Sequence, residues 1–99
     1  MILENWAVIL MNSLDEARKK INEIDKEMAR LFEERMKAVL DVLKYKKEHN
    51  LPVFDEKREV ELIERNLSLL QDTNLKEYYL IFFNALLKSS KKFQGDNYE

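Results

Sequence analysis

The chain has 99 residues, of which 36% are charged, and a formal net charge of −2. This length predicts one domain with a modest core. The near balance of charge argues against a general nucleic-acid-binding protein, which would carry a strong basic excess. One glycine and one proline are too few for the turns of a β protein, so the composition predicts a soluble, all-α domain. Because the chain has no cysteine and a single histidine, we expect no metal site of the thiolate or histidine-rich kind.

The first 13 residues are interpreted as an apolar extension that precedes the domain. The segment contains Trp6 and Met11 among its apolar residues, but it is too short to span a bilayer. It also lacks the basic start and the small-residue cleavage site of a signal peptide. We expect a loosely docked arm, or an arm that packs its apolar side on the domain or on a partner chain.

A long helix is predicted from about Ser13 to about Glu48. Ser13 suits the N-cap position, and Glu16 stands three residues later, which is the spacing of a capping box. Asn50 suits a left-handed position after the helix, and Pro52 cannot continue the helix.

Two shorter helices are predicted after an extended connector at residues 51–54. Asp55 is expected to cap the second helix, and Asn74 the third. The apolar face of the second helix consists of Val60, Ile63, Leu67 and Leu70. The third helix is expected to bury Leu75, Tyr79, Phe82, Leu86 and Phe93. A second row on the third helix becomes polar at its end and consists of Phe83, Leu87, Ser90 and Gln94. Residues 95–99 are predicted to be a disordered tail, which leaves residues 14–94 as the domain.

The length of the first helix predicts a homodimer. A helix of 36 residues is about 54 Å long, whereas a compact monomer of this size has a radius of gyration of about 13 Å. The helix would therefore extend beyond its own domain with an apolar stripe along most of its length. The stripe consists of Leu14, Ala17, Ile21, Ile24, Met28 and Leu31. An antiparallel or crossed homodimer is the simplest way to cover it.

Two cations occupy the continuation of this apolar pattern. Steps of seven residues lead from Met28 to Arg35 and from Val39 to Lys46. Because an unpaired buried cation is costly, the pattern indicates an anion site, although a solvated helix surface is the alternative for each cation. Arg35 and Lys46 share one helix face with an axial gap of roughly 16 Å. Arg18 lies roughly 25 Å before Arg35 along the axis, so it can serve the same small ligand only from a partner chain.

An ordered set of short motifs runs along residues 14–94. They are Leu14-Asp15-Glu16-Ala17-Arg18, Ile24-Asp25, Glu34-Arg35, Lys46, Pro52-Val53-Phe54-Asp55, Arg58-Glu59, Ser90 and Gln94. This set resembles the all-helical, type II chorismate mutases. The resemblance implies three helices in an intertwined homodimer with two equivalent active sites. It also implies a cytoplasmic isomerase that converts chorismate to prephenate for phenylalanine and tyrosine, with no cofactor and no metal.

The resemblance implies roles for the cations and the amide. Arg35 and the partner chain's Arg18 would clamp the two carboxylates of chorismate. Lys46 would contact a carboxylate and the ether oxygen, and Gln94 would donate to the same ether oxygen.

The remaining substrate-binding residues would come from the second and third helices. Glu59, with the backbone near Asp55, would hold the ring hydroxyl group. Arg58 and Ser90 would complete the shell around the carboxylates. The resemblance assigns the catalytic roles to Lys46, Gln94, Arg35 and Glu59.

Two other functions stay open. An isochorismate pyruvate lyase or a related pericyclic enzyme would use a similar cationic pocket, although Glu59 favours the mutase because it suits a ring hydroxyl group. A non-catalytic helical dimer that binds a partner enzyme or senses a metabolite is the other, and the extension at residues 1–13 is the feature that favours it. Docking to another shikimate-pathway enzyme is a further possible partnership of the chain. No nucleic-acid or membrane partner is expected.

Overall fold

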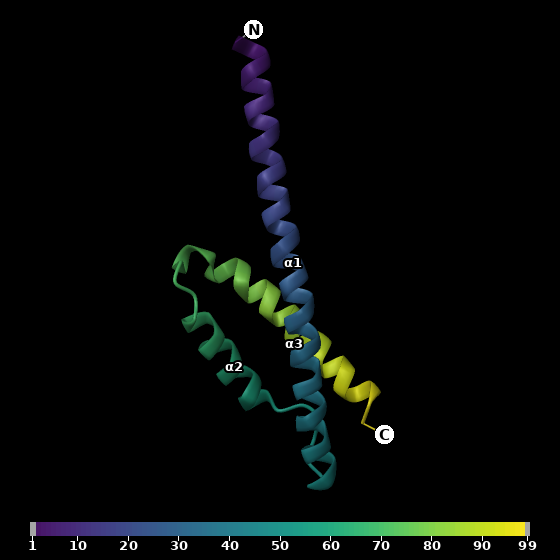
Figure 1. The fold of residues 1–99 in the computed structure, drawn as a ribbon. Coiled ribbons are helices and arrows are strands. Elements are labelled where there is room, and N and C mark those ends of the chain that lie inside the picture. Colours follow the sequence, from purple (N-terminus) through teal and green to yellow (C-terminus); the bar gives the residue numbers. More distant parts are fainter. Residues whose placement is uncertain (1, 99) are drawn as a thin grey trace. The chain divides into compact units, whose positions relative to one another are not determined.

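The computed structural model describes the backbone of residues 2–98 and the side chains of residues 12–98. The described chain forms helices α1 (Ile2–Glu48), α2 (Glu56–Ser68) and α3 (Lys76–Asp96), and a short 3-10 helix η1 (Thr73–Leu75) (Figure 1). The predicted all-α class is confirmed. No described helix combines the length and the apolar character that crossing a membrane requires. The chain divides into two compact units, Met1–Arg35 and Met36–Glu99.

Helix α1 begins at Ile2, eleven residues before the predicted start at Ser13. The prediction was wrong because a residue that suits an N-cap does not by itself end a preceding helix. Neither glycine nor proline occurs in this stretch to break the backbone pattern. The packing expected for the arm lies outside the described residues, because no side chain before residue 12 is described.

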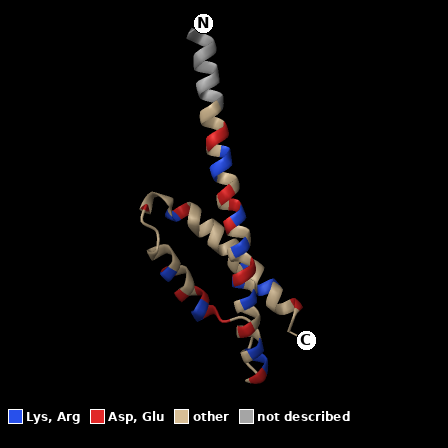
Figure 2. Ribbon diagram, in the orientation of Figure 1, with Lys and Arg blue, Asp and Glu red and all other residues tan. Residues whose placement is uncertain are grey.

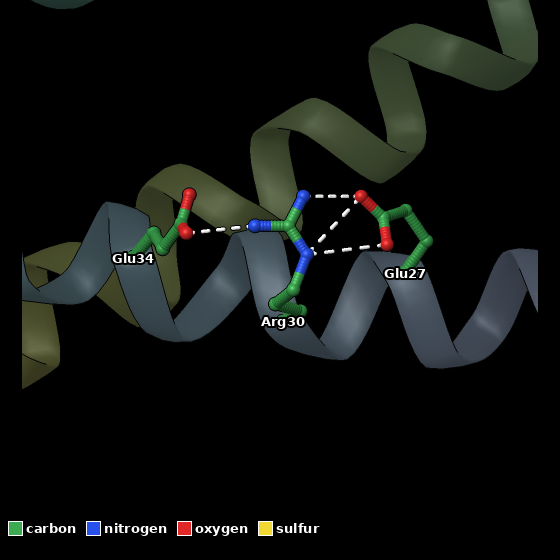
Figure 3. Close-up of polar contacts among 3 residues, drawn as sticks. All are labelled: Glu27, Arg30 and Glu34. Atoms are coloured by element: carbon green, nitrogen blue, oxygen red, sulfur yellow. Dashed lines mark hydrogen bonds and ion pairs between the residues drawn. The ribbon is translucent and has the colours of Figure 1, made fainter.

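Acidic and basic residues are interspersed along α1 (Figure 2). In the first unit, Arg30 pairs with two acidic residues, Glu27 and Glu34. The Arg30 guanidinium contacts the Glu27 carboxylate and donates to Glu34 Oε1 at 2.7 Å (Figure 3). The hydrogen bond from Arg30 lowers the pKa of the Glu27 carboxyl group below its ordinary value of 4.5. The same contacts raise the pKa of Arg30. Because all three side chains are exposed, salt and solvent screen these pairs, and they support the helix only weakly.

The apolar stripe of the first unit is exposed. Leu14, Ile21, Ile24, Met28 and Leu31 each expose between 44% and 55% of their surface. A contiguous apolar surface of this kind is typical of a site where another chain packs.

The end of α1 and the start of α2 form as predicted. Asn50 adopts a left-handed backbone with φ of 54°. The Leu51 amide donates to the Lys46 carbonyl at 2.8 Å, which closes the helix in a Schellman motif. Asp55 caps α2, since its Oδ1 accepts from the Arg58 amide at 3.1 Å.

The core of the second unit is centred on the second predicted row of α3, whereas Tyr79, Leu86 and Phe93 of the row expected to be buried are half-buried. Phe83 and Leu87 are buried together with Leu43 of α1, which is 2% exposed. Phe82, from the predicted row, is 55% exposed, and Leu75 is exposed as well. The 3.6-residue period yields both rows, and the polar residues at the end of the Phe83 row gave no reason to expect that row in the core. That polar end is in fact buried, because a side chain of α1 reaches it at Gln94.

The two ends of α3 also differ from the prediction. Asp72 caps η1 by accepting from the Asn74 amide at 3.0 Å, so Asn74 lies inside this turn and does not cap α3. At the other end, α3 includes Gly95 and extends to Asp96, with Asn97 in the C-cap position. The segment expected to be a disordered tail therefore begins with the last helical turn.

Candidate functional site

Lys46 and Gln94 meet although 48 residues separate them in the chain. Lys46 follows Met36, Val39 and Leu43 on the same face of α1, so its stem continues the buried row of that helix. Its Nζ donates to Gln94 Oε1 at 3.2 Å and to the Val53 carbonyl at 2.8 Å. The ammonium group thus joins α1 to α3 and to the connector before α2.

The Gln94 amide is buried, with 9% of the residue exposed. Because Oε1 accepts from Lys46, the amide nitrogen is the end that can donate to a ligand. Nε2 reaches the Ser90 carbonyl only at 3.5 Å, which is long for a hydrogen bond. The site therefore presents an amide donor beside an ammonium donor.

Glu59 lies in the first turn of α2 and faces α3. Its Oε1 lies 3.0 Å from the Nζ of Lys91, and the side chains are 24% and 40% exposed, respectively. The Glu59 amide donates to the Asp55 carbonyl at 3.0 Å, as expected within the first helical turn. A carboxylate thus stands beside a cation on the α2 side of the site.

Sequence reasoning missed Lys91. A lysine in a run of polar residues near a helix end is normally solvated, and nothing else distinguishes it. The available signal was its position three residues before Gln94, which places the two side chains on the same side of α3.

The other predicted residues of the second unit differ in their readiness to bind an anion. Ser90 is buried, and its hydroxyl group donates to the Leu86 carbonyl at 3.0 Å. That hydroxyl group must rotate before it can donate to a carboxylate. Asp55 is occupied as the cap of α2, and Arg58 is exposed in the first turn of that helix.

The two arginines predicted to clamp the carboxylates belong to the first unit, whereas the other six predicted site residues belong to the second. Arg18 is exposed and Arg35 is half-buried. Among the described side chains, no group of acidic or histidine residues gathers as metal ligands would. The described site therefore consists of hydrogen-bond donors and one ion-paired carboxylate, which suits an anionic or ether-containing ligand with a hydroxyl group.

Comparison with known proteins identifies the family of the chain. Residues 17–95 match the family model described as chorismate mutase type II. The chain belongs to this family. The fold class and the enzyme class expected from the sequence are thereby confirmed: it is an all-α chorismate mutase, an isomerase.

Three curated relatives illustrate the family. The chain is 33% identical to the chorismate mutase of Methanocaldococcus jannaschii over 86 residues, which cover 86% of this chain and 87% of that protein. It is 35% identical over 95 residues to the bifunctional chorismate mutase/prephenate dehydratase of Buchnera aphidicola subsp. Schizaphis graminum, of which it covers 25%. It is 33% identical over 54 residues to the T-protein of Haemophilus influenzae, of which it covers 14%. No solved structure matches the chain significantly.

Proposed function

We propose that this chain converts chorismate to prephenate at the Lys46–Gln94 pair. The observation that carries the proposal is the 3.2 Å contact between Lys46 Nζ and Gln94 Oε1 in a chain of the chorismate mutase type II family. We place the reaction in the cytoplasm, in the supply of prephenate for phenylalanine and tyrosine. The absence of cysteine supports that compartment.

The reaction requires the protein to position the substrate and does not require reactive side chains. It is an intramolecular [3,3] rearrangement in which one C–O bond breaks as one C–C bond forms, so no nucleophile and no proton transfer is required. The protein must hold a flexible dianion in its folded, reactive conformer, which is an orientation effect. Negative charge develops on the ether oxygen as the C–O bond breaks, and donors aimed at that oxygen favour the transition state over the ground state.

Lys46 and Gln94 supply these donors in the proposal. The Lys46 ammonium group has three donors, of which two contact Val53 and Gln94. The third can point to the substrate. Gln94 directs its Nε2 toward the same ligand, because Lys46 holds the oxygen of the amide. Both groups are fixed before substrate binds, so little reorganisation is needed at the moment of reaction.

The substrate's other groups are assigned to the surrounding side chains. Arg35 and the partner chain's Arg18 bind the two carboxylates, with Arg58 and Ser90 completing that shell. Glu59 accepts from the ring hydroxyl group, with the backbone near Asp55. The half-buried position of Arg35 and the buried position of Ser90 support these roles.

The site is completed by a second copy of the chain in this proposal. The exposed apolar stripe of the first unit supports an intertwined homodimer, since it needs a cover of matching length. The predicted distance of roughly 25 Å along the helix between Arg18 and Arg35 supports the exchange of Arg18 between chains. Docking of the dimer to another shikimate-pathway enzyme remains a proposal for residues 1–13.

Incubation of the purified protein with chorismate, followed by measurement of prephenate, tests the function. A parallel reaction with isochorismate measures the release of pyruvate. We expect prephenate from chorismate and no pyruvate from isochorismate. Pyruvate release without prephenate would identify the lyase instead, and a folded dimer that turns over neither compound would indicate a non-catalytic module.

A further inference from the structure

Lys91 makes two contacts that no role assigned above explains. Its Nζ lies 3.0 Å from Glu59 Oε1 on α2 and 4.6 Å from the centre of the Phe54 ring in the connector. Among the described residues, Lys92, the next residue, pairs with Asp96 of its own helix at 2.9 Å, and its side chain is 77% exposed. Of these two adjacent lysines, Lys91 is the one that joins α3 to another helix.

The contact with Phe54 restricts where the ammonium group can lie. A cation over an aromatic face is attracted by the ring quadrupole. The connector that carries Phe54 is itself held, because the neighbouring Val53 carbonyl accepts from Lys46. The ammonium group of Lys91 is therefore held from two sides, and it can hold Glu59 in turn.

The ion pair with Lys91 leaves one oxygen of the Glu59 carboxylate able to accept a hydrogen bond from a ligand. A carboxylate offers about four lone-pair positions on two oxygens, and Lys91 contacts one oxygen, Oε1. The second oxygen can accept from a hydroxyl group while the first stays anchored. Without the anchor, a half-exposed glutamate would sample several rotamers and would lose entropy when it binds a ligand.

We propose that Lys91 is a positioning residue, which fixes the Glu59 carboxylate so that its second oxygen accepts from the ring hydroxyl group of the substrate. This inference rests on the proposed function. Lys91 acts through Glu59 in this proposal and does not itself contact the substrate. Lys91 and Gln94, one turn apart on α3, then set the hydroxyl end and the ether end of the site, respectively.

A double-mutant cycle between Lys91 and Glu59 tests the inference. Lys91→Met removes the charge and keeps the length of the stem, and we expect it to lower kcat/KM for chorismate roughly tenfold. Lys91→Arg, which keeps a cation, is expected to restore most of this loss. In a Glu59→Gln background, Lys91→Met should change kcat/KM by less than about twofold, because the group it positions is already altered. Lys92→Met is the matched control and should behave like the wild type.

The outcomes separate this inference from the proposed function. If the wild type converts chorismate and Lys91→Met behaves like Lys92→Met, the inference is overturned and the function stands. If Lys91→Met lowers kcat/KM by the same factor in the wild-type and Glu59→Gln backgrounds, Lys91 acts independently of Glu59. That result would also overturn the inference. If the wild type itself forms no prephenate, both fail. Circular dichroism of each variant confirms that a loss of activity does not come from unfolding.

Discussion

Lys46 Nζ lies 3.2 Å from Gln94 Oε1, so the two groups assigned to the ether oxygen hold each other in place. One contact both sets the orientation of the Gln94 amide, and so the direction in which its Nε2 donates, and fixes where the ammonium group lies. Such preorganisation lowers a barrier because the donors are not reoriented during the reaction.

Gln94→Ala is expected to act on turnover. Loss of a donor aimed at developing charge costs about 2–4 kcal/mol of barrier, which is roughly 30- to 1,000-fold in kcat. Steady-state kinetics with chorismate measures the effect, and Gln71→Ala, at an exposed glutamine, is the matched control. A change in KM alone would show that Gln94 binds ground state and transition state equally.

Lys47→Met is expected to loosen the end of α3. Lys47 Nζ donates to the Asn97 carbonyl at 2.6 Å and lies 5.8 Å from the centre of the Tyr98 ring. Because these groups are largely exposed, we expect the substitution to lower the free energy of unfolding by about 1 kcal/mol or less. Hydrogen exchange should show faster exchange of amides in the last turn of α3, and Lys44→Met, at an exposed position, should leave them unchanged. Equal exchange in both variants would mean that the Lys47 contact does not hold the helix end.

Local chemistry predicted the junction between α1 and α2 correctly. The left-handed backbone of Asn50 and the N-cap role of Asp55 were predicted correctly. Each of these features depends on only a few neighbouring residues, such as Pro52 after Asn50. The predicted start of α1 was wrong. Ser13 suits an N-cap, but no residue before it breaks the helix that precedes it.

The buried face of α3 could not be chosen from periodicity alone. Phe82 and Phe83 belong to two rows of helical spacing, and a row that ends in the polar residues Ser90 and Gln94 is not expected to form the core. It is buried because a partner from another helix, Lys46, satisfies Gln94, and that contact depends on tertiary structure. The role of Lys91 was missed for the same reason, since its contacts lie on other elements.

Arg30→Gln is expected to change how Glu27 titrates. The hydrogen bond from Arg30 lowers the pKa of Glu27, so the pair stabilises the helix above about pH 4.5, and this is lost as the pH falls through the lowered pKa. In Arg30→Gln the pKa should rise back toward 4.5, and NMR of the side-chain carboxyl carbon measures it. Lys26→Gln removes the same charge from an exposed neighbouring position. An equal rise in both variants would point to general charge and not to the Arg30 contact.

Met28→Lys is expected to weaken the proposed homodimer. It places a charge in the middle of the exposed apolar stripe, which the partner chain would have to bury without a counterion. Sedimentation analysis should show a shift toward the 11.9 kDa single chain. Asn22→Lys adds the same charge beside the stripe and should leave the dimer intact. Dimers of equal stability in both variants would place the interface elsewhere.

A mixing experiment tests the shared site most directly. An Arg18→Ala chain and an Arg35→Ala chain are each purified, shown to be inactive and allowed to exchange subunits, and prephenate formation is then measured. We expect activity to return to about a quarter of the wild-type value per chain, because half of the dimers are mixed and each has one intact site. Persistent inactivity, with subunit exchange confirmed by mass spectrometry, would contradict a site built from both chains.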